Sequence, residues 1–320
     1  MNARERIIDH AKDELVSRLK AEIAQQKKSI SHLTAALDRS RGVTLPPRIV
    51  TGKKRQRAAS DRIRYIFGDM HGIMADRKVV SSVLSDIEQL EPDEIVLLGD
   101  MVNCGGFLAQ HHTLGYVSEI EEADYEHDIA EMNRVLDELQ RIAPQAKIHY
   151  LEGNHEDRVE RWCITQTLAH RKNAEFLRQH FSPEYLLKLK ERGIPYYRRS
   201  QHYHGLPVMG VIKLDKCFFT HSNTCARHAA SVMVSQLGGC VVFGNTHRIQ
   251  ADTIALASTG QITAWSVGCS CKLAQYWHHG SPKNHAHGAG VQVVTKGGRF
   301  MHINYPFLNG ESLLPSLFGK

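Results

Sequence analysis

The 320-residue sequence has no long apolar run. No window reaches the roughly 18 apolar residues that a membrane span requires. The N-terminus is charged from Arg4 to Arg6 and lacks the apolar core of a signal peptide. The seven cysteines are an odd number without zinc-ribbon spacing, which fits a reducing compartment better than a disulfide framework. These absences predict a soluble, cytoplasmic protein with no membrane partner.

The composition allows one large α/β domain and a smaller appendage, because 42% of the residues are hydrophobic. The sequence has no internal repeat of useful length. Its net charge of +6 is mildly basic, which permits an anionic substrate without specifying one.

The first 61 residues differ in pattern from the rest. Apolar residues recur every three or four positions between 8 and 37, so residues 1–45 are predicted to form an amphipathic helical extension. Packing on the rest of the chain and homo-oligomerisation through a coiled coil both fit this helix. Residues 46–61 contain Pro46, Pro47 and the basic run from Lys53 to Arg57, and they form a predicted linker that is either a solvated tether or a phosphate-contacting arm.

From residue 62 to residue 320, strand and helix patterns alternate. Strands are expected at 63–67, 94–98, 147–151, 217–220 and 240–243, helices around 79–90 and 129–139, and a hairpin between 292 and 304. Successive βαβ units make parallel strands, and open α/β sheets bind ligands at the carboxyl ends of such strands. The pattern therefore predicts two packed sheets with helices outside.

Five short motifs rich in metal-binding residues follow these strands. They are Gly68-Asp69-Met70-His71-Gly72, Gly99-Asp100, Gly153-Asn154-His155-Glu156, Thr220-His221-Ser222 and Gly244-Asn245-Thr246-His247. Asp69 and His71 lie two apart on a segment expected to be extended, so both side chains are expected to hold one ion, and Asp100 is suited to bridge two. Carboxylate, imidazole and amide ligands suit manganese, iron or zinc, and two such cations promote in-line attack on phosphorus.

The order and spacing of the five motifs resemble the calcineurin-like metallophosphoesterase superfamily over roughly the last four-fifths of the chain. The resemblance implies an α/β fold with a two-sheet β-sandwich flanked by helices, and two divalent metal ions, with Mn²⁺ expected first and Fe, Zn or Ni as alternatives. It implies that Asp69, His71, Asp100 and His247 hold the first ion, and that Asn154 and His221 hold the second, with Asp100 shared. His155 is implied as the general acid or as the residue that orients the phosphate.

Two positions depart from the pattern of this superfamily. Asn245 stands where a histidine commonly binds the second ion, so we expect a weaker ligand there, unless a histidine of the segments 278–279 or 285–287 replaces it. The protein phosphatases resemble one another in Gly-Asp-x-Val-Asp-Arg-Gly, whereas the corresponding run in this chain is Gly99-Asp100-Met101-Val102-Asn103-Cys104-Gly105. The acid and the arginine are both missing, and Asn103 is expected to orient His155 instead.

Three functions remain open at this point. The missing arginine favours a two-metal phosphodiesterase that acts on nucleic acid or nucleotides. A phosphomonoesterase or protein phosphatase of the same fold is the second. A binding or regulatory module with a weakened site is the third.

Overall fold

The computed structural model describes residues 20, 61–105, 124–167, 174–206, 208–274 and 284–314. The predicted helical extension and most of the predicted linker lie outside the described residues, as do His278 and His279. The first described strand begins at Arg62, one residue before the strand expected at 63–67.

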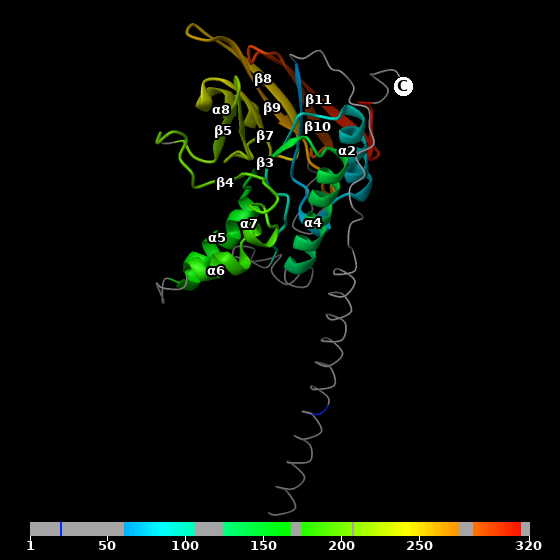
Figure 1. Cartoon of the computed structure of the whole chain (residues 1–320). Helices are drawn as coiled ribbons and strands as arrows, with labels where there is room; N and C mark the ends of the chain where they lie inside the picture. The colour runs from blue at the N-terminus through cyan, green and yellow to red at the C-terminus, as the bar shows by residue number, and fades with distance from the viewer. Residues whose placement is uncertain are drawn as a thin grey trace, which may run out of the picture. The chain divides into compact units, whose positions relative to one another are not determined.

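Two sheets form the centre of this domain (Figure 1). The seven-stranded sheet has the order β12-β11-β10-β1-β2-β3-β4, and the five-stranded sheet has the order β5-β6-β7-β9-β8. The strands of the first sheet are β1 (Arg62–Phe67), β2 (Glu94–Leu97), β3 (Lys147–Leu151), β4 (Tyr196–Tyr197), β10 (Gly288–Val294), β11 (Phe300–Leu308) and β12 (Glu311–Ser312). Those of the second are β5 (Val211–Leu214), β6 (Cys217–Thr220), β7 (Cys240–Phe243), β8 (Ile249–Leu256) and β9 (Gly260–Val267).

Each sheet has a parallel centre, with antiparallel strands at one edge of the seven-stranded sheet and at both edges of the five-stranded sheet. Strands β1 to β4 pair in parallel, and so do β6, β7 and β9. The predicted hairpin is confirmed as the antiparallel pair β10 and β11. Because parallel strands place their carboxyl ends at one edge, the two parallel groups supply the loops of the site.

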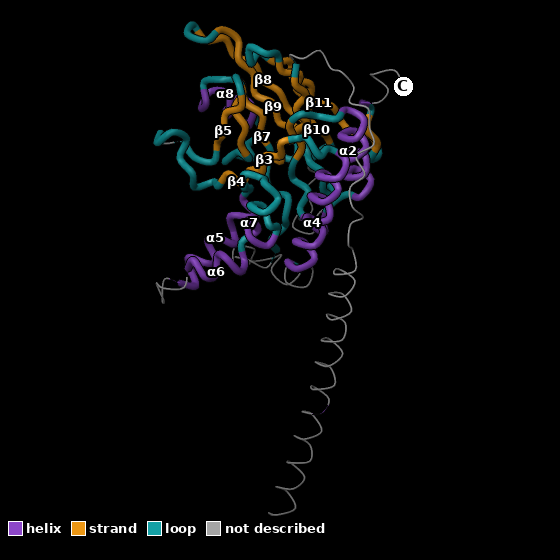
Figure 2. The backbone as a smooth tube through the Cα atoms, in the orientation of Figure 1, coloured by secondary structure: helices purple, strands orange, loops and turns teal. Residues whose placement is uncertain are grey.

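The helices lie on the outer faces of the sheets (Figure 2). They are α2 (Arg77–Leu90), α4 (Tyr125–Ile142), α5 (Asn154–Thr167), α6 (Ala174–Phe181), α7 (Pro183–Leu186) and α8 (Ala229–Leu237), with a short 3-10 helix η1 (Gly72–Met74). Asp76 caps the N-terminus of helix α2, and its side chain accepts hydrogen bonds from the backbone N–H groups of Lys78 and Val79. None of the helices in the described ranges is long and apolar enough to cross a membrane.

Strand alternation divides the core into layers, since successive side chains point to opposite faces. Tyr65 and Phe67 of β1 join the cluster beneath α2 and α4, whereas Ile66 joins the cluster between the two sheets. A third cluster packs α8 on the outer face of the second sheet. The order helix, sheet, sheet, helix confirms the predicted sandwich.

Candidate metal centre

All five motifs meet at the carboxyl ends of the parallel strands, as predicted. Asp69 follows β1, Asp100 follows β2 and Asn154 follows β3, while His221 follows β6. Asn245 and His247 follow β7. The carboxylates and imidazoles of these loops are buried, with relative exposures between 0% for Asp69 and 7% for His247. Two sheets therefore contribute ligand-type side chains to one enclosed site.

The backbone of these loops adopts an unusual conformation. Asp69, His71, Asp100, Asn245 and His247 have positive φ angles of 51°, 55°, 49°, 72° and 53°. The prediction that Asp69 and His71 lie on an extended segment is wrong, because both are left-handed. Such residues cost on the order of 1–3 kcal/mol each and cluster at functional sites. The chain therefore turns sharply at five of the candidate ligands, whereas Asn154 and His221 are not among the residues with positive φ.

His221 lies in one half of the site, and its partners define its tautomer. Its Nδ1 lies 2.8 Å from the carbonyl oxygen of Leu98, which can only accept, so Nδ1 carries the proton. Its Nε2 faces Asn154 Oδ1 at 3.0 Å and Asp100 Oδ2 at 3.2 Å. When His221 is neutral, His221 Nε2, Asn154 Oδ1 and Asp100 Oδ2 all carry lone pairs and repel one another. A cation bound between them would accept all three lone pairs.

His71 and His247 lie in the other half of the site. Their Nε2 atoms are 3.1 Å apart, and His247 Nε2 is 3.3 Å from Asp69 Oδ1. Asp100 Oδ2 is 3.9 Å from His71 Nε2, so this carboxylate oxygen lies close to both halves of the site. Asp100 therefore lies between the two halves of the site, and its role as the bridging ligand stays a prediction.

The charge states of these groups fit divalent cations. Burial lowers the pKa of His71 to about 4, which keeps its imidazole neutral. Burial opposes the ionisation of Asp100, but the neighbouring charges of His221 and His155 outweigh it and hold the pKa of that carboxyl well below its usual range. Burial opposes protonation of His221 and His247, but the nearby carboxylates of Asp100 and Asp69 outweigh it, so the pKa of His221 is raised and that of His247 rises to about 9. Carboxylates that attract positive charge beside imidazole nitrogens form a donor set that manganese, iron and zinc take. The residues present therefore fit a two-metal centre.

Glu156 joins two of the metal-binding loops without reaching the centre itself. Its carboxylate accepts hydrogen bonds from the backbone N–H groups of Asp100, Met101 and Gly153, at 3.0, 2.7 and 3.0 Å. Gly153 is required beside it, because a Cβ at that position would lie 2.1 Å from Asp100 Oδ1. The sequence motif contained Glu156, but the sequence analysis assigned it no role.

Asp128 of α4 performs a similar task for two other loops. It is fully buried and accepts hydrogen bonds from the backbone N–H groups of Ile73 and Cys104, at 2.9 and 3.1 Å. Burial raises the pKa of this carboxyl to about 7. Sequence reasoning missed Asp128, because it lies in a helix far along the chain from both loops.

His155 is held by a backbone group. Its Nδ1 donates to the main-chain carbonyl oxygen of Asn103 at 2.7 Å. The sequence predicted that the side chain of Asn103 orients His155, whereas here the backbone of the same residue does so. Its Nε2 lies 3.2 Å from a guanidinium nitrogen of Arg158 and 3.8 Å from Asp100 Oδ2. Arg158 was missed in the sequence, although its spacing of three residues from His155 places both on one side of α5.

Residues 65–238 match the family model described as calcineurin-like phosphoesterase. The chain belongs to this family. Solved structures similar to it include Yfce, a phosphoesterase from E. coli, at 15% identity over 76% of this chain and 98% of that chain, with a TM-score of 0.33. Vacuolar Protein Sorting 29 from Cryptosporidium parvum is similar at 9% identity over 78% and 98% of the two chains, with a TM-score of 0.34. No curated protein matches the sequence significantly.

As a calcineurin-like phosphoesterase, the chain is a hydrolase of phosphoric esters with a set of candidate metal-binding residues. Among the described residues, three sets bring together imidazoles with carboxylates or a thiol: His71, His247 and Cys271; His71, Asp100 and His155; and Asp69, Asp100 and His221. The atoms of each set lie within 4.8 Å of one another. The identity of the metal is part of the proposal below.

In this phosphoesterase, Asn245 lies beside the half of the site that contains His221. Its side-chain oxygen accepts from the Cys225 thiol at 3.3 Å, and its amide nitrogen donates to the carbonyl oxygen of Ser222 at 3.3 Å. The histidines considered as replacements lie elsewhere: the ring of His285 is 4.8 Å from that of His247, and His287 contacts the Cys271 carbonyl oxygen at 2.8 Å. Both therefore lie on the side of the first ion.

We predict that Asn245→His strengthens the second metal site, because an imidazole is a stronger donor than an amide for borderline cations. The apparent affinity for Mn²⁺ should rise, and so should activity at limiting metal. At saturating Mn²⁺ the gain should shrink, since both proteins are then fully loaded. Mn²⁺ titration of the parent and the variant measures this, with Asn309→His as a control for a histidine added far from the site. Equal stoichiometry and affinity would contradict the assignment of Asn245.

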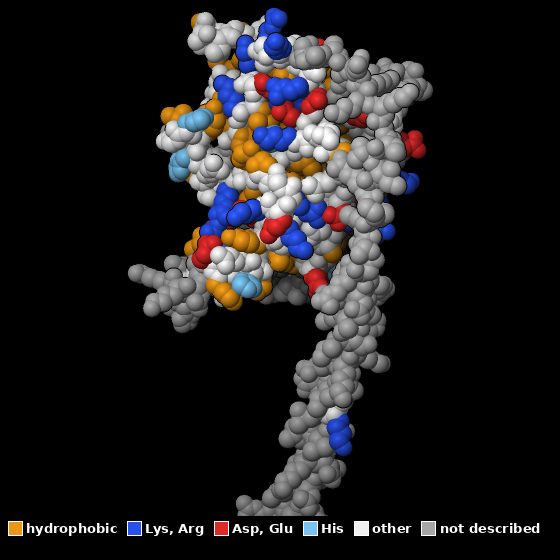
Figure 3. Space-filling model, in the orientation of Figure 1, with side chains coloured by type: hydrophobic (Ala, Val, Ile, Leu, Met, Phe, Trp, Pro, Cys, Tyr) orange, Lys and Arg blue, Asp and Glu red, His pale blue; other side chains and the backbone are white. Residues whose placement is uncertain are grey.

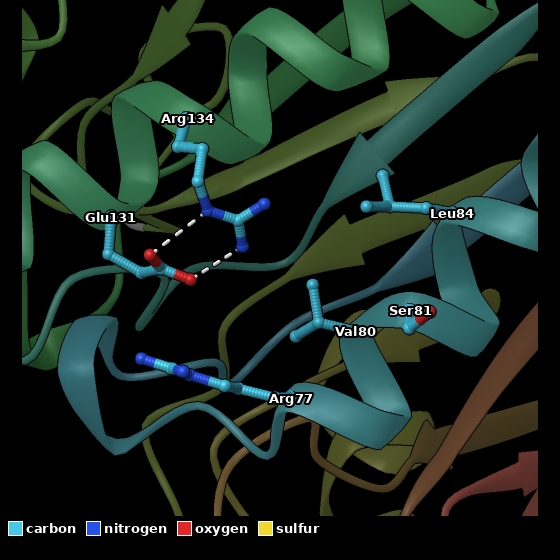
Figure 4. A pocket seen from close by; sticks show the side chains of 6 residues that line it. All are labelled: Arg77, Val80, Ser81, Leu84, Glu131 and Arg134. Carbon is cyan, nitrogen blue, oxygen red and sulfur yellow. Dashed lines mark hydrogen bonds and ion pairs between the residues drawn. The ribbon is translucent and has the colours of Figure 1, made fainter.

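A cavity of about 430 Å³ lies between α2 and α4 and contains none of the predicted site residues (Figure 4). Arg77, Val80, Ser81 and Leu84 line it from α2, and Glu131 and Arg134 line it from α4. Glu131 already binds Arg134 through two hydrogen bonds, of 3.1 and 2.7 Å. We therefore place the chemistry of this phosphoesterase at the metal centre.

Proposed function

We propose that the protein is a two-metal phosphodiesterase that acts on nucleic acid or nucleotides. In this proposal Mn²⁺ is the expected metal, and Asp100 bridges the two ions. The other ligands are Asp69, His71 and His247 for the first ion, and Asn154, His221 and Asn245 for the second. The convergence of Asp100 Oδ2 with His221 Nε2 at 3.2 Å and His71 Nε2 at 3.9 Å is the observation that carries the two-metal assignment.

When bound, two such ions lower the pKa of a bridging water and neutralise phosphate oxygens. The chain's own residues position the substrate around them. His155 is locked by the Asn103 carbonyl oxygen, so its Nε2 is directed towards Asp100 and Arg158. We propose that Arg158 donates to a phosphate oxygen while His155 holds the guanidinium in place.

The loop after β2 supports a diester over a monoester. Between Gly99 and Gly105 it has no cationic side chain, and Asp100, Met101 and Asn103 are buried, with exposures of 1%, 0% and 2%. The guanidinium that we assign to the substrate is that of Arg158, on helix α5. One guanidinium matches the single negative charge of a diester better than the two charges of a monoester.

The distribution of charged side chains on the surface bears on the size of the substrate. On the face shown in Figure 3, the Lys and Arg side chains of the described residues are interspersed with acidic and apolar ones. A long duplex is normally bound through a continuous basic band that contacts many phosphates. This face therefore favours a nucleotide or a short nucleic-acid segment over a long duplex.

We predict that the Mn²⁺-loaded protein cleaves bis-p-nitrophenyl phosphate with a higher kcat/KM than p-nitrophenyl phosphate. The reason is the missing cationic side chain in the loop after β2. Parallel steady-state measurements with both substrates test this, with metal-stripped protein as the control. A higher kcat/KM for the monoester would favour the phosphomonoesterase alternative. No metal-dependent turnover of either substrate would favour the binding module.

A further inference from the structure

Two buried thiols follow β9, at the same sheet edge as the metal ligands. Strand β9 pairs in parallel with β7, and its continuation contains Cys269 and Cys271, both 0% exposed. Cys269 and Cys271 are two residues apart, a spacing that places both side chains on one face of an extended segment, and their thiols hydrogen-bond each other. The Ser270 backbone N–H also donates to the Asp69 carbonyl oxygen at 3.1 Å. This segment is therefore joined directly to a ligand loop.

The two ring nitrogens of His247 face different partners. Its Nε2 lies 3.1 Å from His71 Nε2 and 3.3 Å from Asp69 Oδ1, among the candidate ligands. Its Nδ1, across the ring, lies 3.8 Å from Cys271 Sγ, which is within hydrogen-bonding distance for sulfur. If Nε2 binds a cation, the neutral imidazole carries its proton on Nδ1 and directs it at the sulfur.

We propose that Cys271 is the positioning residue for His247, accepting a hydrogen bond from Nδ1–H while Nε2 binds the first metal ion. This inference rests on the proposed ligand role of His247. A metal-binding histidine almost always donates its other N–H to a fixed acceptor, and that contact sets the tautomer and the ring orientation. Carboxylates, backbone carbonyls and water are the usual acceptors, and here a buried thiol takes their place. Cys269 holds the Cys271 thiol in turn.

The surroundings of His247 leave few ways to replace this contact. The ring is 7% exposed, with His71 on one side and His285 on another, at centroid distances of 5.0 and 4.8 Å. Removing the sulfur would leave a buried N–H without its acceptor, which carries a desolvation cost. The ring would then lose the constraint that directs Nε2 at the ion.

Metal titration of Cys271→Ala and Cys271→Ser tests the proposal. Calorimetric titration of the metal-stripped proteins with Mn²⁺ should show one site weakened roughly 10- to 100-fold in Cys271→Ala, with the other site unchanged. Cys271→Ser should lose less, because its hydroxyl still accepts a hydrogen bond. Cys163→Ala is the matched control, since it also removes a fully buried thiol but lies in the core beneath the sheet. If the alanine variant does not fold, the serine variant compared with Cys163→Ser carries the test.

A second measurement separates positioning from direct ligation. The Co²⁺-substituted parent should show no sulfur-to-cobalt charge-transfer absorption, because Cys271 faces the nitrogen remote from the ion. An absorption band that disappears in Cys271→Ala would make Cys271 a ligand and overturn the proposal. If the parent binds Mn²⁺ at two sites and Cys271→Ala binds it with unchanged affinity, the positioning role of the thiol is overturned, but the ligand assignment of His247 stands. A parent that binds no metal would overturn the ligand assignment on which the proposed function also depends.

Discussion

Asp100→Asn is expected to reduce turnover by roughly 1,000-fold or more while leaving the fold intact. The asparagine oxygen can keep the Oδ1 hydrogen bond from the His155 backbone N–H, which is 2.8 Å long. Its NH₂ group would replace Oδ2, the atom that faces His221 at 3.2 Å and His71 at 3.9 Å. A neutral donor there removes the bridging charge from both halves of the site. Diesterase activity, Mn²⁺ stoichiometry and the melting temperature measure the three expectations.

Asp137→Asn is the control for Asp100→Asn, because Asp137 lies on α4 with 43% of its side chain exposed and pairs with Arg192. Its activity should match the parent. The same loss as for Asp100→Asn is expected for Asp69→Asn and His221→Ala. Normal turnover by a purified, folded Asp100→Asn protein would rule out the two-metal mechanism.

Arg158→Met is expected to lower kcat/KM for the diester on the order of 100-fold, with little change in Mn²⁺ affinity. Methionine keeps a similar apolar stem but cannot donate to a phosphate oxygen. The guanidinium nitrogen that contacts His155 Nε2 at 3.2 Å would be absent, so inhibition by inorganic phosphate should weaken as well. Added guanidinium ion should restore part of the rate.

Arg161→Met provides the comparison for Arg158→Met. Arg161 lies on the same helix, with 51% of its side chain exposed and a 3.0 Å ion pair to Asp157. This variant should keep the parental kcat/KM and gain nothing from guanidinium. Equal losses in the two variants would mean that Arg158 stabilises α5 and does not bind phosphate.

The fold and most of the candidate site could be predicted from the sequence because strands and ligands follow one another closely along the chain. Each of the five motifs follows a short apolar run, and parallel strands bring their carboxyl ends together. Asp100 and His221 are 121 residues apart in sequence, yet the strand pattern alone placed them at one edge.

The features of the site that the sequence did not predict depend on backbone conformation and on contacts between distant segments. Asp and His enter the left-handed region more often than most other residues, but this preference is too weak to reveal the turns at Asp69 and His71, so the segment was expected to be extended. A side-chain pattern does not reveal that the Asn103 carbonyl oxygen binds His155. Asp128 and Cys271 are short polar residues within apolar surroundings, and only the tertiary contacts show what they hold.

Glu156 has a consequence for how quickly the site can respond to substrate. It ties the end of β2 to the start of α5 through the backbone amides of Asp100, Met101 and Gly153, and Tyr150 also donates to it at 2.9 Å. Two ligand loops joined at a buried carboxylate cannot open independently, so the separation of their ligands is set before substrate arrives. Such preorganisation removes loop closure around these ligands from the reaction path. We therefore expect product release or chemistry, and not assembly of this part of the centre, to limit the rate.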